Sequence, residues 1–210
     1  MAIYNLAEIK DNFELSILNL ECNGISRSYS TPFFDQWYDA LRRAAHSGHQ
    51  ELTLSSENVE VFQKAVIFKT FVLRIPFCIP VLEQCAAYST AETIPISEFL
   101  NKNSLFDYSY IPNCSQRNIK MQPILVLPFP IADKRFLVAD GNHRLSFAID
   151  HQQTVQAKFI ESPIQAAEAI PLQFPKAYYL LVYETWLLSQ IPLLKDFKFD
   201  VSRSLATSFL

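Results

Sequence analysis

Hydrophobic positions in the first 90 residues recur at helical spacing. The clearest helix is predicted to begin at Thr31-Pro32, where a capping hydroxyl precedes a proline suited to the first helical position, and to end near Gly48. Its apolar face consists of Phe34, Trp37, Leu41 and Ala45. A second helix is predicted to begin after Ser56, to run through Phe68 and to end or kink before Pro76. A short third helix is predicted from Pro80 through Cys85.

From Ile94 onward the pattern changes to short apolar runs, which are typical of strands. The predicted elements are strands at 94–96, 123–127, 136–139 and 155–159, a turn of helix at 97–100, and a helical face formed by Leu145, Ala148 and Ile149. The second and third of these strands are continuous apolar runs, as expected for strands buried on both faces. Residues 101–121 are irregular and are predicted to form a loop that folds over a site.

Helical spacing returns after Pro163. The apolar positions that indicate it are Tyr178, Leu181, Val182, Trp186 and Leu187. We therefore predict an α+β fold, in which a small mixed α/β domain of residues 91–165 is flanked by helical regions. These are an N-terminal region of residues 1–90 and a C-terminal region of residues 166–210 packed on the domain.

Two apolar stretches, residues 65–82 and 177–194, are long enough to be tested as membrane spans. Charged, amide and proline side chains interrupt them: Lys69, Arg74, Pro76, Pro80, Glu184, Gln190 and Pro192. Because a spanning helix needs about 20 mainly apolar residues, both are predicted to be buried helices, with peripheral membrane contact as the alternative, and no integral membrane segment is expected. The N-terminus lacks the basic segment and long apolar run of a secretory signal, so a cytoplasmic location is expected.

Composition narrows the class of protein. A chain of 210 residues with 50% hydrophobic content can bury a sizeable core without disulfide staples. The formal net charge of −3 and a sequence pI near 5.8 disfavour general attraction to nucleic acid. The cysteines form no CxxC pair and no spacing typical of a zinc site, so they are predicted to be reduced thiols: Cys22, Cys78, Cys85 and Cys114.

The segment Asp140-Gly141-Asn142-His143-Arg144 carries the candidate chemistry. Gly141, one of three glycines in the chain, stands where a predicted strand passes into a helix. Glycine permits a sharp turn and a close approach to a ligand, so the free N–H groups of the next three residues can point at an anion. Arg144 would add a bidentate charged contact, and His143 a donor that can shuttle a proton. The segment predicts a phosphate site, with Lys134 on the preceding loop as a further candidate contact.

The same residues resemble the ParB/sulfiredoxin superfamily, which includes sulfiredoxins, free-serine kinases that use ADP or ATP, partition-protein CTPases and ParB-like nucleases. The resemblance covers about a third of the chain and rests on residues 94–96, 123–126, 136–139, 140–144 and Ala148. It implies a small ParB/sulfiredoxin-like sheet-and-helix domain. It also implies catalytic roles for Asp140 and His143 and phosphate contacts from Gly141, Asn142, His143 and Arg144.

The motif matches the Asp-Gly-X-His-Arg form of the free-serine kinases. Sulfiredoxins carry a nucleophilic cysteine where this chain has Asn142, and the CTPases usually show Gly-Glu-Arg-Arg instead. The resemblance thus implies ATP or ADP with Mg²⁺, and either nucleotide hydrolysis or transfer of a phosphoryl group to a small hydroxyl compound or a protein. Asp140 would help to deprotonate the acceptor, and Glu98 or Asp107 are candidates, by position only, for an assisting carboxylate.

Other interpretations of these residues stay open. Asp140 can instead be a helix cap, and Lys134 an ordinary solvated lysine. A ParB-like nuclease would cleave nucleic acid with the same residues, although it would require a basic surface near them. A noncatalytic module would use the fold to present its helical flanks to a protein partner.

Overall fold

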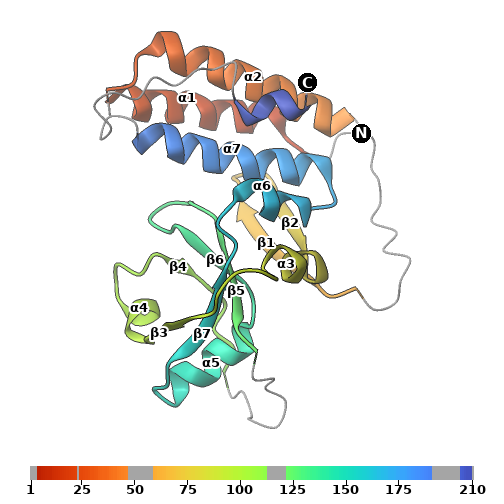
Figure 1. The fold of residues 1–210 in the computed structure, drawn as a ribbon. Helices are drawn as coiled ribbons and strands as arrows, with labels where there is room; N and C mark the ends of the chain where they lie inside the picture. The colour runs from red at the N-terminus through yellow and green to blue at the C-terminus, as the bar shows by residue number, and fades with distance from the viewer. Residues whose placement is uncertain (1–3, 23, 47–58, 113–121, 191–203, 210) are drawn as a thin grey trace. The chain divides into compact units, whose positions relative to one another are not determined.

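A computed structural model of the chain describes residues 4–22, 24–46, 59–112, 122–190 and 204–209. Contacts group the chain into two compact units (Figure 1). The helical unit comprises residues 1–55, 63–76 and 170–210, and the sheet unit comprises residues 56–62 and 77–169. This grouping differs from three consecutive regions divided after residues 90 and 165, although the sheet unit includes the whole of the predicted α/β domain. The described residues form helices and two sheets, so the predicted α+β fold with helical flanks is confirmed.

The described part of the helical unit is built around α2. Its helices are α1 (Leu6–Cys22), α2 (Arg27–His46), α7 (Gln173–Gln190) and the 3-10 helix η4 (Leu205–Phe209). α2 contacts each of the others. Phe34, Trp37 and Leu41 are buried on α2, which confirms the apolar face predicted from helical spacing.

The start of α2 differs from the prediction. The helix begins at Arg27 rather than at Thr31-Pro32, and Pro32 lies inside it. A proline in the second turn removes one intrahelical hydrogen bond. Most of the stability of a helix in a protein comes from packing of its apolar face, and Phe33 and Phe34 beside this proline are buried. The packing therefore outweighs the local signal.

A buried carboxylate joins three elements of the helical unit. Glu184 of α7 is 3% exposed and accepts hydrogen bonds from Trp37 Nε1 at 2.7 Å and from the Ser204 hydroxyl at 2.8 Å. It also accepts the Leu205 N–H at 3.0 Å. These donors offset the free-energy cost of burying a carboxylate. Through them, the Glu184 side chain links α2, α7 and the start of η4.

Two strands, β1 (Val61–Ile67) and β2 (Val72–Cys78), form a two-stranded sheet. The helix predicted after Ser56 is therefore wrong, and the buried helix predicted at residues 65–82 is wrong up to Cys78. In β2, Leu73 and Ile75 are buried whereas Val72 and Arg74 are exposed, which is the two-residue period of a strand. A short helix follows, α3 (Ile79–Cys85), as predicted.

The turn between β1 and β2 is attached to α1 by Glu8. The Glu8 carboxylate accepts the backbone N–H groups of Lys69 and Thr70 and the Thr70 hydroxyl. Asn5 donates from its side-chain amide to the same hydroxyl at 3.0 Å. Residues at the start of α1 thus hold the turn between β1 and β2 by hydrogen bonds.

The sheet unit is organised around a five-stranded sheet of order β3-β7-β5-β6-β4. The strands are β3 (Glu92–Ile94), β4 (Phe106–Asp107), β5 (Ile124–Pro128), β6 (Phe136–Asp140) and β7 (Val155–Phe159). β5 runs antiparallel to β6 and parallel to β7, while β4 is parallel to β6 and β3 antiparallel to β7. The predicted strands are confirmed, the first of them two residues earlier than expected, and β4 lies within the segment predicted as a loop.

The core of the sheet unit lies between the sheet and two helices, α4 (Ser97–Leu100) and α5 (Asn142–Asp150). Val126 and Val138, which pair on neighbouring strands, pack with Phe99 of α4 and Leu145 of α5. Every residue of β5 is buried, as the continuous apolar run predicts. A further helix, α6 (Pro163–Glu168), contacts β5 and α3.

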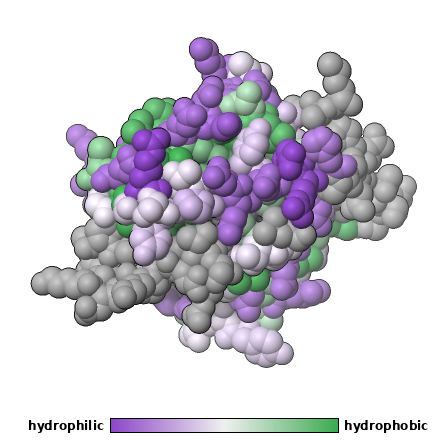
Figure 2. Space-filling model, turned by 90° about the horizontal axis from the view of Figure 1, so that it is seen from above, coloured by the Kyte–Doolittle hydropathy of each residue, from purple (hydrophilic) through white to green (hydrophobic). Residues whose placement is uncertain are grey.

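The polar and apolar side chains on the surface of the described residues are mixed as on an ordinary protein surface. Among those residues, no helix is long and apolar enough to cross a membrane. Figure 2 shows one face, on which hydrophilic residues predominate and hydrophobic residues form small patches. Scattered exposed apolar side chains such as Leu15 and Tyr88 are normal and need no partner to explain them.

Candidate functional site

The predicted motif occupies the junction between β6 and α5. Asp140 is the last residue of β6, Gly141 has φ +88° and ψ +20°, and α5 begins at Asn142. This backbone conformation is unfavourable for residues with a Cβ and accessible to glycine. Gly141 therefore turns the chain from the strand directly into the helix, as the sequence predicts.

Gly141 is also required because the space above its Cα is filled. A Cβ built on Gly141 would lie 2.6 Å from Ile124 Cγ2 and 2.8 Å from Arg144 Nη2. Both contacts are too short for a real Cβ atom. The Ile124 and Arg144 side chains thus pack directly against the backbone of the turn.

Arg144 forms an ion pair with Asp140. Arg144 Nη2 donates to Asp140 Oδ2 at 2.6 Å and to the carbonyl oxygen of Pro123 at 3.2 Å. The two side chains are 14% and 21% exposed, whereas those of the surface pair Arg42–Asp39 are 56% and 50% exposed. Arg144 Nε is buried and has no hydrogen-bond partner in the described structure. The guanidinium therefore connects the end of β6 to the residue before β5.

Asn142 and Ser146 attach another segment to α5. Asn142 is 8% exposed, accepts the Ser109 N–H at 2.8 Å through its side-chain oxygen, and donates to the Val138 carbonyl at 3.1 Å. The Ser146 hydroxyl accepts the Ile111 N–H at 2.8 Å. The Asn142 side chain is thus committed to holding the backbone after β4, which leaves its own N–H as the group available to an anion.

Three backbone N–H groups remain at the N-terminus of α5. Leu145 donates to the Gly141 carbonyl, which is the first hydrogen bond of the helix. No described residue accepts the N–H groups of residues 142–144. His143, between them, is exposed, and its ring has no hydrogen bond to a described residue. Such a helix start can bind an oxyanion by N–H donation and by the helix dipole.

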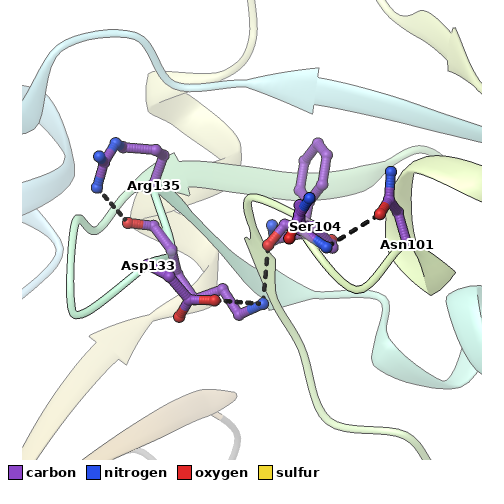
Figure 3. A network of polar contacts seen from close by, with 7 residues as sticks. Asn101, Ser104, Asp133 and Arg135 are labelled. Atoms are coloured by element: carbon purple, nitrogen blue, oxygen red, sulfur yellow. Dashed lines mark hydrogen bonds and ion pairs between the residues drawn. The ribbon is translucent and has the colours of Figure 1, made fainter.

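Lys134 lies at the other end of β6. At about 3.3 Å per residue, the five residues of this strand place its ends about 13 Å apart. Lys134 Nζ donates to the Ser104 carbonyl at 2.8 Å and lies 3.6 Å from Asp133 Oδ2, in the network around Ser104, Asp133 and Arg135 (Figure 3). The structure therefore does not bring Lys134 to the residues 140–144, and the predicted phosphate contact is not supported.

The two candidate upstream carboxylates lie on different elements. Asp107 ends β4 and pairs with Leu137 of β6. Because β4 and β6 are parallel, the chain beyond Asp107 runs toward the same end of the sheet as Asp140. Glu98 is exposed on α4. The role of either residue stays a prediction.

The residues of the candidate site could hold Mg²⁺ only together with the phosphates of a bound nucleotide. Among the described residues, no group of three or more His, Cys, Asp and Glu side chains could hold a metal. Mg²⁺ at nucleotide sites is bound by one or two carboxylates together with phosphate oxygens and water, so such a group is not required. Asp140, which is not fully buried, is the carboxylate next to the N–H groups of α5.

Several residues of the site carry no sequence signal. Ser146 and the Pro123 carbonyl act through contacts with residues 35 and 21 positions away. The serine four residues after Asn142 and the proline before a strand are both common in ordinary structure. The aromatic segment at 101–121 was the one available hint, and its residues Cys114 and Arg117 lie outside the described residues.

Comparison of the chain with protein-family models, curated proteins and solved structures found no match. The resemblance to the ParB/sulfiredoxin superfamily therefore stays a prediction from the motif and from the predicted elements. Evidence on function comes from the site residues themselves.

Proposed function

We propose that the protein binds ATP or ADP, with the phosphates at the N-terminus of α5, and that it transfers or hydrolyses the terminal phosphoryl group. The observation that carries this proposal is the set of N–H groups at residues 142–144, which no described residue accepts, directly after Gly141 at φ +88°. These groups and the helix dipole favour a bound anion.

The side chains around these N–H groups suit phosphoryl transfer. His143 is exposed and can donate to a phosphate oxygen. The positive charge of Arg144 balances the negative charge of Asp140 beside the turn, so that carboxylate repels an anionic ligand less. Asp140 Oδ2 accepts a hydrogen bond from Arg144, and Asp140 Oδ1 has no partner among the described residues. A carboxylate in this place can orient an attacking hydroxyl or water and accept its proton.

Chemistry and the resemblance support a proposed acceptor and a proposed cellular location. The Asp-Gly-X-His-Arg form of residues 140–144 supports a small hydroxyl compound as acceptor, with a protein hydroxyl as the alternative. The net charge of −3 weighs against nucleic acid. The cysteines of the described residues are free thiols, which supports a cytoplasmic location.

The experiment is calorimetric titration of the full chain with Mg²⁺-ATP, Mg²⁺-ADP and Mg²⁺-CTP, together with a phosphate-release assay. His143→Ala removes the imidazole, whereas His143→Pro also removes the N–H in the first helical turn, where proline is tolerated. Because a hydrogen bond to a charged group contributes about 1.5–3 kcal/mol, we expect His143→Pro to bind roughly 10- to 100-fold more weakly than His143→Ala. Circular dichroism checks that both variants are folded.

Equal binding by the two variants would show that the helix N-terminus does not hold the phosphates. If the wild-type chain binds none of the nucleotides, the proposed function is wrong. Cleavage assays on RNA and DNA would then test the nuclease alternative, and a fold without either activity would favour the noncatalytic module.

A further inference from the structure

The Arg144 side chain is oriented toward the protein. Its Nη2 donates to Asp140 Oδ2 and to the Pro123 carbonyl, its Nε is buried, and the guanidinium lies over Gly141. With 14% of the side chain exposed, it is far less accessible than Arg42, which is 56% exposed in its own pair with an aspartate. Arg144 is thus packed as part of the turn.

This orientation limits how Arg144 can contact a phosphate. A guanidinium offers two planar forks to an oxyanion, Nε with Nη2 and Nη1 with Nη2, and both include Nη2. In Arg144 that nitrogen already serves Asp140 and Pro123. Neither fork is free, so the bidentate phosphate contact predicted from the motif would require the pair with Asp140 to break.

The same contacts restrict the Asp140 carboxylate. The carboxylate of an aspartate can rotate about χ2, its last side-chain torsion. The energy of this torsion varies little with its angle, so the torsion alone does not select one orientation. The 2.6 Å contact between Oδ2 and Arg144 Nη2 selects one, because Arg144 is itself held by Pro123 and by packing on Gly141. The other oxygen, Oδ1, is left without a partner in the described structure.

We propose that Arg144 is the positioning residue of Asp140: it acts on the reaction by orienting this carboxylate and does not bind the phosphates directly. This inference rests on the function proposed above and assigns Arg144 a different role from the one the motif predicts. Asp140 is the catalytic residue, and Arg144 acts through it.

The chemical step then has defined partners. The acceptor hydroxyl, or a water molecule, gives its proton to Asp140 Oδ1 while its oxygen forms a bond to the γ-phosphorus of ATP. The bond from that phosphorus to the β–γ bridging oxygen breaks, and ADP leaves with the electron pair. Asp140 later returns the proton to solvent. A misplaced carboxylate would slow this step without weakening the contacts of the phosphates with α5.

The experiment compares Arg144→Gln, Arg144→Lys, Asp140→Asn and the double variant Asp140→Asn/Arg144→Gln, with Arg42→Ala as the control for loss of an Arg–Asp pair. ATP affinity is measured by calorimetry and kcat by phosphate release in the presence of Mg²⁺. Since a misplacement of about 1 Å can cost about 100-fold in rate, we expect Arg144→Gln to lower kcat by roughly 10- to 100-fold with little change in affinity. Arg144→Lys, which keeps a donor and the charge, should recover part of the rate.

The double variant separates positioning from a direct role. If Arg144 acts only through Asp140, Arg144→Gln lowers kcat in the wild-type background and has no further effect in Asp140→Asn. Loss of ATP binding in both Arg144 variants, with melting temperatures close to wild type, would instead make Arg144 a phosphate ligand and overturn the inference. An equal fall in kcat in both backgrounds would also overturn it. Absence of ATP binding by the wild-type chain is the separate outcome that removes the proposed function.

Discussion

Gly141 and Gly24 both have a positive φ angle, but their surroundings differ. Their φ angles are +88° and +92°, but a Cβ at Gly24 would meet nothing within 4 Å, while one at Gly141 would meet Ile124 at 2.6 Å. We therefore expect Gly24→Ala to lower the free energy of unfolding by about 1–2 kcal/mol through backbone strain alone. Gly141→Ala should cost about 1–3 kcal/mol more, because Ile124 and Arg144 must move.

Urea unfolding followed by circular dichroism measures both variants. Tryptophan fluorescence reports the helical unit separately, since both tryptophans of the chain, Trp37 and Trp186, belong to it. An equal decrease in the free energy of unfolding in the two variants would mean that the close packing above Gly141 contributes nothing to stability.

The sequence predicts some contacts of this junction and not others. The glycine between an apolar run and a helical face was sufficient to predict the turn. The Asp140–Arg144 pair was not predicted, although the residues are four apart, because that spacing indicates contact only within a helix and Asp140 belongs to a strand. The turn at Gly141 brings the two together. Lys134 was close in sequence, but an extended strand separates it from the site.

At the scale of elements, Asn142 and Ser146 hold the backbone after β4 at two separate points. Asn142 accepts the N–H of Ser109, and Ser146 accepts the N–H of Ile111. We expect Asn142→Ala to increase hydrogen exchange at the Ser109 amide and Ser146→Ala to increase it at the Ile111 amide. Loss of a buried hydrogen-bonding group should lower the free energy of unfolding by about 1–3 kcal/mol in Asn142→Ala.

Each variant serves as the control for the other. Amide exchange measured by NMR resolves the two sites, and exchange that rises equally at both amides in both variants would contradict independent attachment. Unchanged exchange in either variant would mean that the corresponding hydrogen bond does not protect the segment.

Elements differ in how clearly the sequence indicates them. β5 and β6 are continuous apolar runs bounded by prolines or polar residues, and the structure confirms them. The hairpin of β1 and β2 was missed because the apolar residues from Val61 to Phe68 also satisfy helical spacing. Its turn, Phe68-Lys69-Thr70-Phe71, contains none of the glycine, asparagine, aspartate or proline residues that indicate a turn. Contacts with Glu8, about 60 residues earlier, stabilise it instead.

At the scale of the whole molecule, two glutamates of the helical unit should give stability opposite dependences on pH. Burial raises the pKa of Glu184 above 4.5, against the opposing effect of its hydrogen bonds from Leu205, Ser204 and Trp37. For Glu8, the hydrogen bond from the Thr70 hydroxyl lowers the pKa below 4.5, assisted by the backbone donors Lys69 and Thr70 and opposed by burial.

The signs follow from proton binding in the folded and unfolded states. Folded Glu184 binds a proton more tightly than unfolded Glu184, so its contribution to stability decreases as pH rises above about 4.5. Folded Glu8 binds a proton less tightly, so its contribution is present above that pH and is lost as pH falls. The difference in free energy of unfolding between wild type and Glu184→Gln should therefore decrease with rising pH, and the difference for Glu8→Gln should increase.

Urea unfolding followed by tryptophan fluorescence between pH 3 and pH 8 checks both slopes in the same unit. Each variant is the control for general effects of pH on the chain. Slopes of the same sign would mean that burial does not dominate at Glu184 or that the Thr70 contacts do not form at Glu8.

The helical unit is interrupted in the chain by the sheet unit. Trp37 and Glu184 touch although they lie 147 positions apart in the sequence, and the sheet unit accounts for most of that interval. In connectivity, the two segments of the sheet unit, residues 56–62 and 77–169, are thus inserted into the helical unit. Closing so long a loop costs entropy before any contact of α2 with α7 forms, and contacts between residues so distant in the sequence generally slow folding. If the sheet unit folds first, the chain left to be closed between α2 and α7 is shorter, and the entropic cost of that closure is lower.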